Sequence, residues 1–361
     1  MTELSEILGR RIAGEGPISV HDFMAEALSH PEHGYYMGRI PLGAAGDFTT
    51  APEVSQMFGE LIGLWCAVVW QAMGSPKAVN LVELGPGRGT LMKDALRAAE
   101  ALPAFRAALN PHLVEISPVL RDCQRATLAD TGVPICWHDS LDAAPAGRVI
   151  VVANEFLDAL PIRQYQRTAD GWCERLVDRG DNGEGFRFVL SAPLEETPPL
   201  PPKLFEAPEG SIVEVCPAAR ETARALAGRV VDGGGAALMV DYGYAESAVG
   251  DTFQAVKQHT YFDVLSEPGS ADLTAHVDFA SLARAAYSGG AEVYGPTSQG
   301  VFLERLGIQT RGEALLGAAE PEQHEEILSA HRRLVHPEEM GVLFKVMAFG
   351  HPELPPPPGF G

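Results

Sequence analysis

Short apolar runs alternate with amphipathic stretches through the middle of the chain. Strand-like runs are expected at 78–84, 111–116, 134–139, 148–155 and 236–243. Helices are predicted between the first four runs, at roughly 89–101 and 117–130, with a short connection near 140–147. Apolar strands that alternate with helices are typical of a parallel sheet covered on both faces. Two further strand candidates, 291–296 and 341–350, are expected to pair near one edge of this sheet.

The rest of the pattern suggests segments around this core. Residues 2–30 predict two helices, the second capped by Ser19, and 54–74 predicts a buried helix. Short runs within 163–210 indicate an antiparallel excursion, whereas 251–340 is expected to be mostly loop and helix. We therefore expect three parts: an N-terminal helical and loop segment (1–75), a core with insertions at about 163–210 and 251–340 (76–350), and a peripheral proline-rich tail (351–361).

Composition narrows the class of partner. The 361 residues include 27 basic and 48 acidic side chains, a net charge of −21, which repels a phosphate backbone and makes nucleic acid an improbable partner. Acidity also serves solubility alone, so it does not by itself indicate a basic partner. The most apolar run, 61–74, is too short to span a bilayer.

The cysteines and the N-terminus bear on location. The five cysteines form no CxxC pair, which argues for a reducing compartment and against structural zinc, and no metal-binding constellation is visible in the sequence. The first residues carry neither the apolar core of a signal peptide nor the acid-poor composition of a transit peptide. A cytoplasmic protein of bacterial type is therefore expected.

A glycine-rich turn, "ELGPGRGTL" (83–91), follows the first strand of the alternating region. It departs from the dinucleotide pattern G-x-G-x-x-G, and no Gly-Lys-Ser/Thr follows as in a P-loop. The E-x-G-x-G-x-G form resembles the cofactor loop of class I S-adenosylmethionine-dependent methyltransferases. Glycines let the backbone pass close beneath such a ligand, and Glu83 can hold its amino group, directly or through water.

Further acids occur at the ends of the next strands, where open α/β sheets bind ligands. Glu115 can accept hydrogen bonds from both ribose hydroxyls, and Asp139 can read the adenine amino group. The stretch "ANEFLDALP" (153–161) ends the fourth strand beside the reacting methyl group. An ordinary tight turn with solvated acids remains the alternative interpretation.

Several blocks resemble one family over nearly the whole chain. They are "GYYM" (34–37), "GDFTTAPEVSQMFGELIGLW" (46–65), "VELGPGRGTLMKDALR" (82–97), "NEFLDALPI" (154–162), "DYG" (241–243) and "LTAHVDF" (273–279). The blocks are similar to those of the MidA-like methyltransferases, which include a mitochondrial arginine methyltransferase needed for assembly of respiratory complex I. The segments 163–210 and 300–340 match no motif.

The resemblance implies a fold, a cofactor and a substrate. The fold is the class I methyltransferase (Rossmann-like) fold: a mostly parallel seven-stranded sheet with helices on both faces, N-terminal helices and inserted substrate-side segments. The methyl donor that the resemblance implies is S-adenosylmethionine, and the reaction that it implies is symmetric dimethylation of an arginine on a complex I subunit. The candidate cofactor-binding residues are Asp47, Glu83, Gly85, Pro86, Gly87, Gly89, Thr90, Glu115, Asp139, Ser140 and Asn154.

Methylation of arginine requires carboxylates near the acceptor. A guanidinium is a poor nucleophile because its proton is held tightly, with a pKa above about 12, and carboxylates can orient its planar fork. Glu155 and Asp158 are the first candidates, because i and i+3 lie on one face of a helix or turn. The alternative is that Asp158 caps a short helix while Glu155 contacts the cofactor.

Two further groups are candidates for the acceptor site. Asp241 and Tyr242 can complete the pocket wall, although a structural role in a turn is about as plausible. His276 and Asp278 can act as proton acceptor and orienter, unless Asp278 caps the helix that follows. Two other functions stay open at this point: an assembly chaperone that binds the cofactor without catalysis, and a small-molecule methyltransferase.

Overall fold

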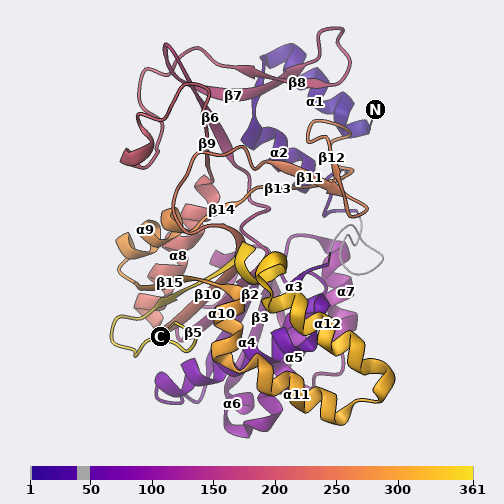
Figure 1. The fold of residues 1–361 in the computed structure, drawn as a ribbon, viewed down its shortest axis with the longest axis vertical. Helices are drawn as coiled ribbons and strands as arrows, with labels where there is room; N and C mark the ends of the chain where they lie inside the picture. The colour runs from indigo at the N-terminus through magenta and orange to yellow at the C-terminus, as the bar shows by residue number, and fades with distance from the viewer. Residues whose placement is uncertain (1, 39–48, 361) are drawn as a thin grey trace.

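A twisted mixed sheet forms the centre of the computed structural model, which describes residues 2–38 and 49–360 (Figure 1). Its strand order is β15-β16-β10-β5-β2-β3-β4, with the short β14 added beside β10. The bounds are β2 Val79–Leu84, β3 Leu109–Val114, β4 Cys136–His138, β5 Val149–Asn154, β10 Gly235–Tyr244, β14 Val277–Asp278, β15 Glu292–Ser298 and β16 Phe344–Gly350. Only β16 in this sheet runs antiparallel to its neighbours, β10 and β15. The predicted strands and the predicted edge pair are confirmed.

Side chains of successive strand residues enter opposite cores, as the period of two requires. On β5, Ile150 and Val152 face one core, whereas Val149 and Val151 face the other. The first core is covered by α4, α5 and α10 to α12, and the second by α8 and α9. The helix bounds are α4 Gln56–Ala72, α5 Thr90–Ala98, α6 Pro103–Ala108, α7 Pro118–Leu128, α8 Pro217–Gly233, α9 Phe279–Ser288, α10 Gln299–Leu306, α11 Ile308–Ala318 and α12 His324–Val335, with short helical turns η1 Ala99–Ala101, η2 Leu141–Ala143, η3 Pro202–Leu204, η4 Pro321–Gln323 and η5 Pro337–Gly341.

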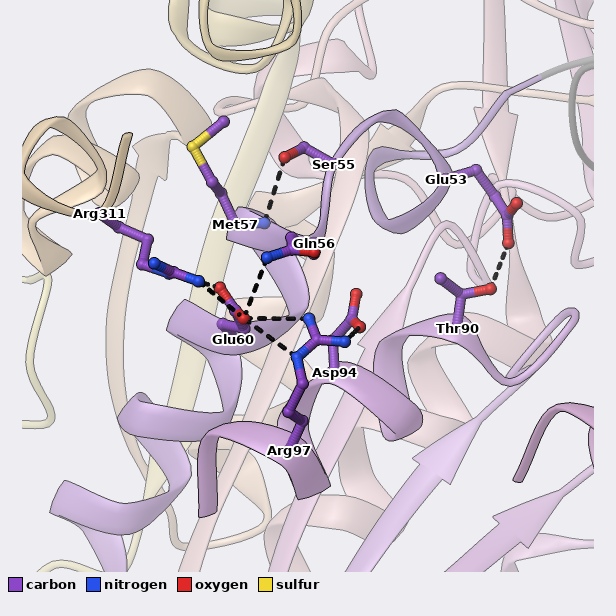
Figure 2. Close-up of polar contacts among 9 residues, drawn as sticks. All are labelled: Glu53, Ser55, Gln56, Met57, Glu60, Thr90, Asp94, Arg97 and Arg311. Carbon is purple, nitrogen blue, oxygen red and sulfur yellow. Dashed lines mark hydrogen bonds and ion pairs between the residues drawn. The ribbon is translucent and has the colours of Figure 1, made fainter. Parts of the chain in front are cut away.

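Helix α4 packs unusually closely on α5. A Cβ at Gly63 would lie 2.7 Å from the Cα of Ala95, so a larger residue there would push the helices apart. Beside this contact the buried carboxylate of Glu60 accepts hydrogen bonds from Arg97 on α5 and from Arg311 on α11 (Figure 2). A buried carboxylate with two guanidinium partners has its charge compensated. The pair of helices therefore forms a fixed support for the loop that precedes α5.

A second layer lies above the carboxyl ends of the core strands (Figure 1). It contains two helices, a five-stranded antiparallel sheet and a three-stranded antiparallel sheet. The bounds are α1 Glu3–Glu15, α2 Val20–Ser29, β1 Ile18–Ser19, β6 Arg163–Thr168, β7 Gly171–Arg179, β8 Phe186–Leu190, β9 Ile212–Val215, β11 Gln254–Lys257, β12 Thr260–Phe262 and β13 Asp272–Thr274. The side chain of Ser19 accepts a hydrogen bond from the Asp22 amide and caps α2, as predicted.

Two features of the structure differ from expectation. The antiparallel excursion within 163–210 is confirmed, but the segment expected to be loop and helix also supplies β11 to β13. These strands have only three or four residues each, too few for an alternating pattern to stand out. The C-terminal tail is also better anchored than expected, because the indole of Trp65 donates to the Pro358 carbonyl at 3.2 Å.

The three-part division of the chain stays a proposal, because nothing tests its boundaries. Over the described ranges, no helix is both long enough and apolar enough to cross a membrane.

Candidate functional site

An open cavity of about 180 Å³ lies where β2, β3 and β5 end, beneath the second layer. Carboxyl ends of parallel strands are the usual ligand-binding edge of an open sheet. The residues lining it are Leu28, Ser29, Tyr36, Thr50, Pro52, Glu53, Glu83, Gly85, Pro86, Gly87, Arg88, Thr90, Leu91, Glu115, Ile116, Leu120, Asn154, Glu155, Phe156, Ala159 and Leu160. Seven of the eleven predicted cofactor residues line this cavity, and they come from three separate strand ends: Glu83, Gly85, Pro86, Gly87, Thr90, Glu115 and Asn154.

 Glu155, which was predicted to bind the acceptor with the cofactor as its alternative partner, also lines the cavity.

The glycine turn between β2 and α5 forms the floor of the cavity. Gly85, Gly87 and Gly89 have φ values of 60°, 54° and 84°, a region that side chains with a Cβ rarely adopt. A Cβ at Gly85 would also lie 2.7 Å from the Phe156 ring. Gly89 is the residue before the first turn of α5 and does not itself line the cavity. The turn therefore requires glycine for its backbone and for the close approach of Phe156.

Glu83 is buried at the end of β2, with a side chain that reaches the cavity. Burial raises the pKa of its carboxyl to about 8, and its Oε2 atom has no hydrogen-bond partner among the described residues. Burial of a carboxylate oxygen without a hydrogen-bond partner raises the free energy of the folded state. A cationic ligand group in the cavity would remove that cost.

Glu115 follows β3 and is held in place by its neighbours. Its Oε1 accepts a hydrogen bond from the Ser117 amide at 2.8 Å, and its Oε2 accepts one from the Gln124 side chain at 3.2 Å. The same Gln124 amide group donates to the carbonyl of Gly87 at 2.8 Å. Burial raises the pKa of Glu115. The acid is thus fixed relative to the glycine turn, and Ile116 beside it leaves an apolar, half-exposed surface on the cavity wall.

The short helix α3 (Ala51–Val54) crosses the cavity from one strand end to another. At its start the Ala51 amide donates to Glu155 Oε1 at 2.9 Å, and at its end Glu53 accepts hydrogen bonds from Thr90 and, at 3.1 Å, from Arg88. Figure 2 shows Glu53 directed at Thr90 on the start of α5. Sequence reasoning missed Glu53 and Arg88, although both lie in blocks quoted for the family resemblance.

Glu155 follows β5 with a φ of 48°, which is rare for a residue with a side chain. Its Oε1 accepts from the Asn154 side chain at 3.1 Å as well as from Ala51. Burial raises the pKa of this carboxyl to about 7, and the nearby Asp158 adds to the rise. The Asn154 amide nitrogen donates to Glu155, whereas the Asn154 Oδ1 is buried and has no hydrogen-bond partner among the described residues.

Asp158 is buried behind the cavity wall and is not one of the lining residues. Its Oδ2 accepts a hydrogen bond from the Tyr242 hydroxyl at 2.6 Å, and its Oδ1 has no partner in the described structure. Burial raises the pKa of its carboxyl. The predicted i, i+3 pair is thus split: Glu155 faces the cavity, whereas Asp158 lies one layer behind it.

Asp241 is fully buried, and its carboxylate accepts hydrogen bonds from backbone amides. Its Oδ2 accepts from the backbone amides of Phe156, Leu157 and Asp158 at 2.9–3.2 Å, and its Oδ1 accepts from the Tyr242 amide at 3.0 Å. Burial and the neighbouring acids raise its pKa well above the usual range. The alternative interpretation, a role in a turn, describes these contacts better than a pocket-wall role.

His276 and Asp278 are not brought together as an acid–base pair. Asp278 accepts from the Ser281 amide at 2.9 Å and caps α9, while its Oδ2 accepts from the Ser247 hydroxyl. The His276 ring packs edge-on against Tyr242, 5.6 Å between centroids, and burial lowers its pKa. His276 lines a second, smaller cavity rather than the one described above.

Three further residues predicted to bind the cofactor are not among the described residues that line the cavity. Asp139 is 87% exposed in its side chain and pairs with Arg121 at 2.6 Å. The Ser140 hydroxyl accepts from the Ala143 amide, which caps a short helical turn. Neither residue lines the cavity. Asp47 lies outside the described residues. Their proposed contacts with a ligand stay predictions.

The chain matches one family model and resembles a solved structure with a bound ligand. Residues 61–297 match the model of a family described as "Putative S-adenosyl-L-methionine-dependent methyltransferase". A crystal structure of a protein from Burkholderia thailandensis, bound to S-adenosyl-homocysteine, superposes with a TM-score of 0.84 at 31% identity, over 99% of this chain and 92% of that one. The ligand-bound neighbour and the family model agree on the class of cofactor.

Curated relatives are similar over almost the full chain. "Protein arginine methyltransferase NDUFAF7, mitochondrial" of Danio rerio is 41% identical over 94% of this chain and 84% of the relative. The Homo sapiens protein of the same name is 38% identical, over 96% and 83%. Because these relatives are named as mitochondrial, the expectation of a cytoplasmic protein is wrong. The N-terminal composition that suggested it was a poor guide to location.

Proposed function

The chain belongs to the family of S-adenosylmethionine-dependent methyltransferases, and from this premise we propose that it methylates arginine side chains of a protein substrate. The relatives that suggest this substrate are named protein arginine methyltransferases. The finer proposal is symmetric dimethylation of an arginine on a subunit of respiratory complex I, and its support is the family resemblance of the sequence blocks.

The cavity fits the cofactor. S-adenosylmethionine supplies an electrophilic methyl group on a sulfonium centre. The orphaned Oε2 of Glu83 would accept from its amino group, Glu115 would bind the ribose hydroxyls, and the glycine turn would lie beneath the nucleoside. Four acids among the lining residues match a ligand whose net charge is positive. Asn154 remains in the proposal as a further contact.

The observation that carries the acceptor proposal is the Oδ1 atom of Asp158, which lies one layer behind Glu155 and has no hydrogen-bond partner within the described residues. A guanidinium has five N–H donors and no acceptor, so buried carboxylate oxygens without partners are suitable acceptors for it. Tyr242 holds the other oxygen of Asp158 and so directs Oδ1. We infer that Glu155 and Asp158 orient the guanidinium, while Asp241 holds the turn that carries both.

The raised pKa values agree with a cationic guest. Burial raises the pKa of Glu155 to about 7 and also raises that of Asp158, so both carboxyls are short of compensating charge in the free protein. An arginine side chain would supply that charge and favour the ionised carboxylates. The same two carboxylates would stabilise the methylated product, which remains a cation, and can take the proton released from the attacking nitrogen.

Incubation of the pure protein with labelled S-adenosylmethionine tests this function. Candidate complex I proteins and arginine-bearing peptides serve as acceptors, with the same peptides carrying lysine in place of arginine as matched controls. Label in methylarginine after hydrolysis, absent from the lysine peptides, is the expected result. Cofactor binding without any transfer would favour a non-catalytic assembly chaperone, and label confined to small molecules would favour a small-molecule methyltransferase. Either of these outcomes contradicts the proposal.

A further inference from the structure

The last turn of α12 carries two exposed arginines that differ in their partners. Arg332 pairs with Glu339 at 3.2 Å. Arg333 is also exposed, but within residues 2–38 and 49–360 its guanidinium has neither an ion pair nor a hydrogen bond. A guanidinium carries five N–H donors. All five of those on Arg333 are therefore available to a partner molecule.

Arg333 lies on the acceptor side of the site. Helix α12 packs against α3, whose Ala51 amide donates to Glu155 (Figure 1). Burial raises the pKa of Glu155, and the positive charge of Arg333 is near enough to oppose part of that rise. Arg333 is not among the residues that line the cofactor cavity. It is thus a cation outside the cavity and close to an acid proposed to hold the acceptor arginine.

Two exposed aliphatic side chains lie beside the same end of α12. Val342 and Leu343 are 50% and 46% exposed and connect η5 to β16. A Cβ at Gly341 would lie 2.0 Å from the carbonyl oxygen of Val335, so this connection starts directly against the end of α12. The Lys345 ammonium donates to the carbonyls of both Val342 and Leu343. The backbone of the two exposed residues is therefore held in place.

The first residue of β16 links this connection to the second acceptor acid. The Phe344 ring packs against that of Tyr242, with 5.4 Å between centroids, and the Tyr242 hydroxyl donates to Asp158. The free cation thus lies near one proposed acceptor acid, and the aliphatic pair lies near the side chain that holds the other. We call this region the flanking surface; its residues are Arg333, Val342 and Leu343.

A protein-bound arginine reaches the site together with the residues before and after it in its own chain. We propose that the flanking surface binds this stretch of the substrate and that Arg333 pairs with an aspartate or glutamate a few residues from the methylated arginine. An arginine suits this pairing because its planar fork can donate two parallel hydrogen bonds to one carboxylate. The exposed aliphatic pair favours apolar residues in the same stretch. The inference rests on the proposed arginine methylation and adds to it a sequence preference.

Peptide binding to the wild-type protein, saturated with S-adenosyl-homocysteine, gives the first test. Each peptide carries one arginine among alanine and valine residues, with one glutamate placed within about five residues on either side, a reach of roughly 17 Å for an extended chain. Glutamine replaces the glutamate in the matched peptides. Fluorescence anisotropy should show, at one or two positions, about fivefold tighter binding of the glutamate peptide, and this difference should shrink at high salt. Equal affinities at every position would overturn the proposal.

Charge reversal by Arg333→Glu gives the second test. The variant should lose the preference for glutamate and should instead bind more tightly a peptide with lysine at the same position. The matched control is Arg332→Glu, because Arg332 lies on the same turn of α12 and already has Glu339 as its partner. This control should keep the wild-type preference. Affinity for S-adenosyl-homocysteine, measured on the same preparations, should be unchanged in both variants and shows that they are folded.

Two results with the folded Arg333→Glu variant would overturn the proposal. An equal loss of affinity for the glutamate and glutamine peptides would mean that Arg333 acts only through the charge of Glu155. A preference for glutamate that the variant keeps would mean that another residue binds the acid. Because the readout is peptide binding and not methyl transfer, a preference that depends on Arg333 in a protein without transfer activity would support the flanking surface and contradict only the proposed methylation.

Discussion

The cofactor side and the acceptor side of the cavity use similar acids in different ways. On the cofactor side, Glu83 and Glu115 line the cavity directly, each at the end of its own strand. On the acceptor side, only Glu155 lines the cavity, while Asp158 and Asp241 lie behind it. Asp241 is occupied by four backbone amides. The acid directly after a strand thus lines the cavity on both sides, whereas Asp158, three residues farther on, and Asp241, within β10, lie behind it.

The difference follows from the connections after each strand. The turn after β2 is rich in glycine and enters α5 directly, so Glu83 lines the cavity at the strand end without a side chain from another strand to hold the turn. After β5 the chain makes an irregular turn through Phe156, Leu157 and Asp158, whose amides need an acceptor. Asp241 on the neighbouring β10 supplies it. Asp241 is therefore needed to hold the turn that carries Glu155 and Asp158, the acids proposed to bind the substrate.

The largest effect is expected for Asp241→Ala. Its removal leaves buried amides without an acceptor, at about 1–3 kcal/mol for each group, so we expect the free energy of unfolding to fall by about 3–5 kcal/mol, a loss typical of broken buried networks. Denaturant unfolding measures it, with the exposed Asp232→Ala as control. A loss below about 1 kcal/mol with normal folding would remove the distinction drawn between Asp241 and its neighbours.

A smaller effect is expected for Glu115→Ala on the cofactor side. The change removes the acceptor for two ribose hydroxyls, so the affinity for S-adenosylmethionine should fall at least about tenfold. Calorimetry measures this, with Asp122→Ala, an exposed acid on α7, as the control. Binding that is unchanged in the folded variant would show that Glu115 only orders Ser117 and Gln124.

The smallest effect concerns the pH dependence of cofactor binding through Glu83. Because burial raises its pKa to about 8, the folded protein holds this proton at pH 7, and binding of an ammonium group requires its loss. The ratio of wild-type to Glu83→Gln affinity should therefore rise roughly fivefold between pH 7 and pH 8. Taking the ratio cancels the titration of the ligand itself. A ratio that does not change with pH would exclude Glu83 as the partner of the ammonium group.

Titration of Glu83 should also affect the free energy of unfolding, with a pH dependence opposite in sign to that of cofactor binding. Its pKa is raised from 4.5 to about 8, so between these values the folded protein binds more protons than the unfolded chain. The contribution of Glu83 to the free energy of unfolding therefore falls as pH rises through this window. Glu83→Gln should remove this part of the pH dependence in denaturant unfolding of the free protein.

Local patterns predicted the parts of the site that are local in sequence. The glycine turn and the acids at the ends of β2 and β3 lie next to their strands, so finding the strands located them. Contacts between distant segments were not predictable: Glu53 meets Thr90 across 37 positions, and Asp241 meets the turn at 156–158 across more than 80. Such pairs depend on how α3 and β10 are placed by the fold.

Side-chain direction limited the remaining predictions. Asp139 follows β4 as Glu115 follows β3, but its carboxylate points to Arg121 at the surface. Asp278 stands one position before α9, where a capping role and a catalytic role look alike in sequence. The short strands β11 to β13 were not predicted from the sequence, because they are defined by their pairing partners and not by their own residues.

The division between the two sides of the cavity is tested most directly by Asp158→Asn, which keeps the size of the side chain and removes its charge. Transfer to an arginine-bearing peptide and affinity for S-adenosylmethionine are measured on the same preparation, with the exposed Asp170→Asn as control. The account predicts that transfer falls by a factor of roughly 10² while cofactor affinity stays within about twofold. Near-normal transfer, or a fall in cofactor affinity equal to the fall in transfer, would contradict it.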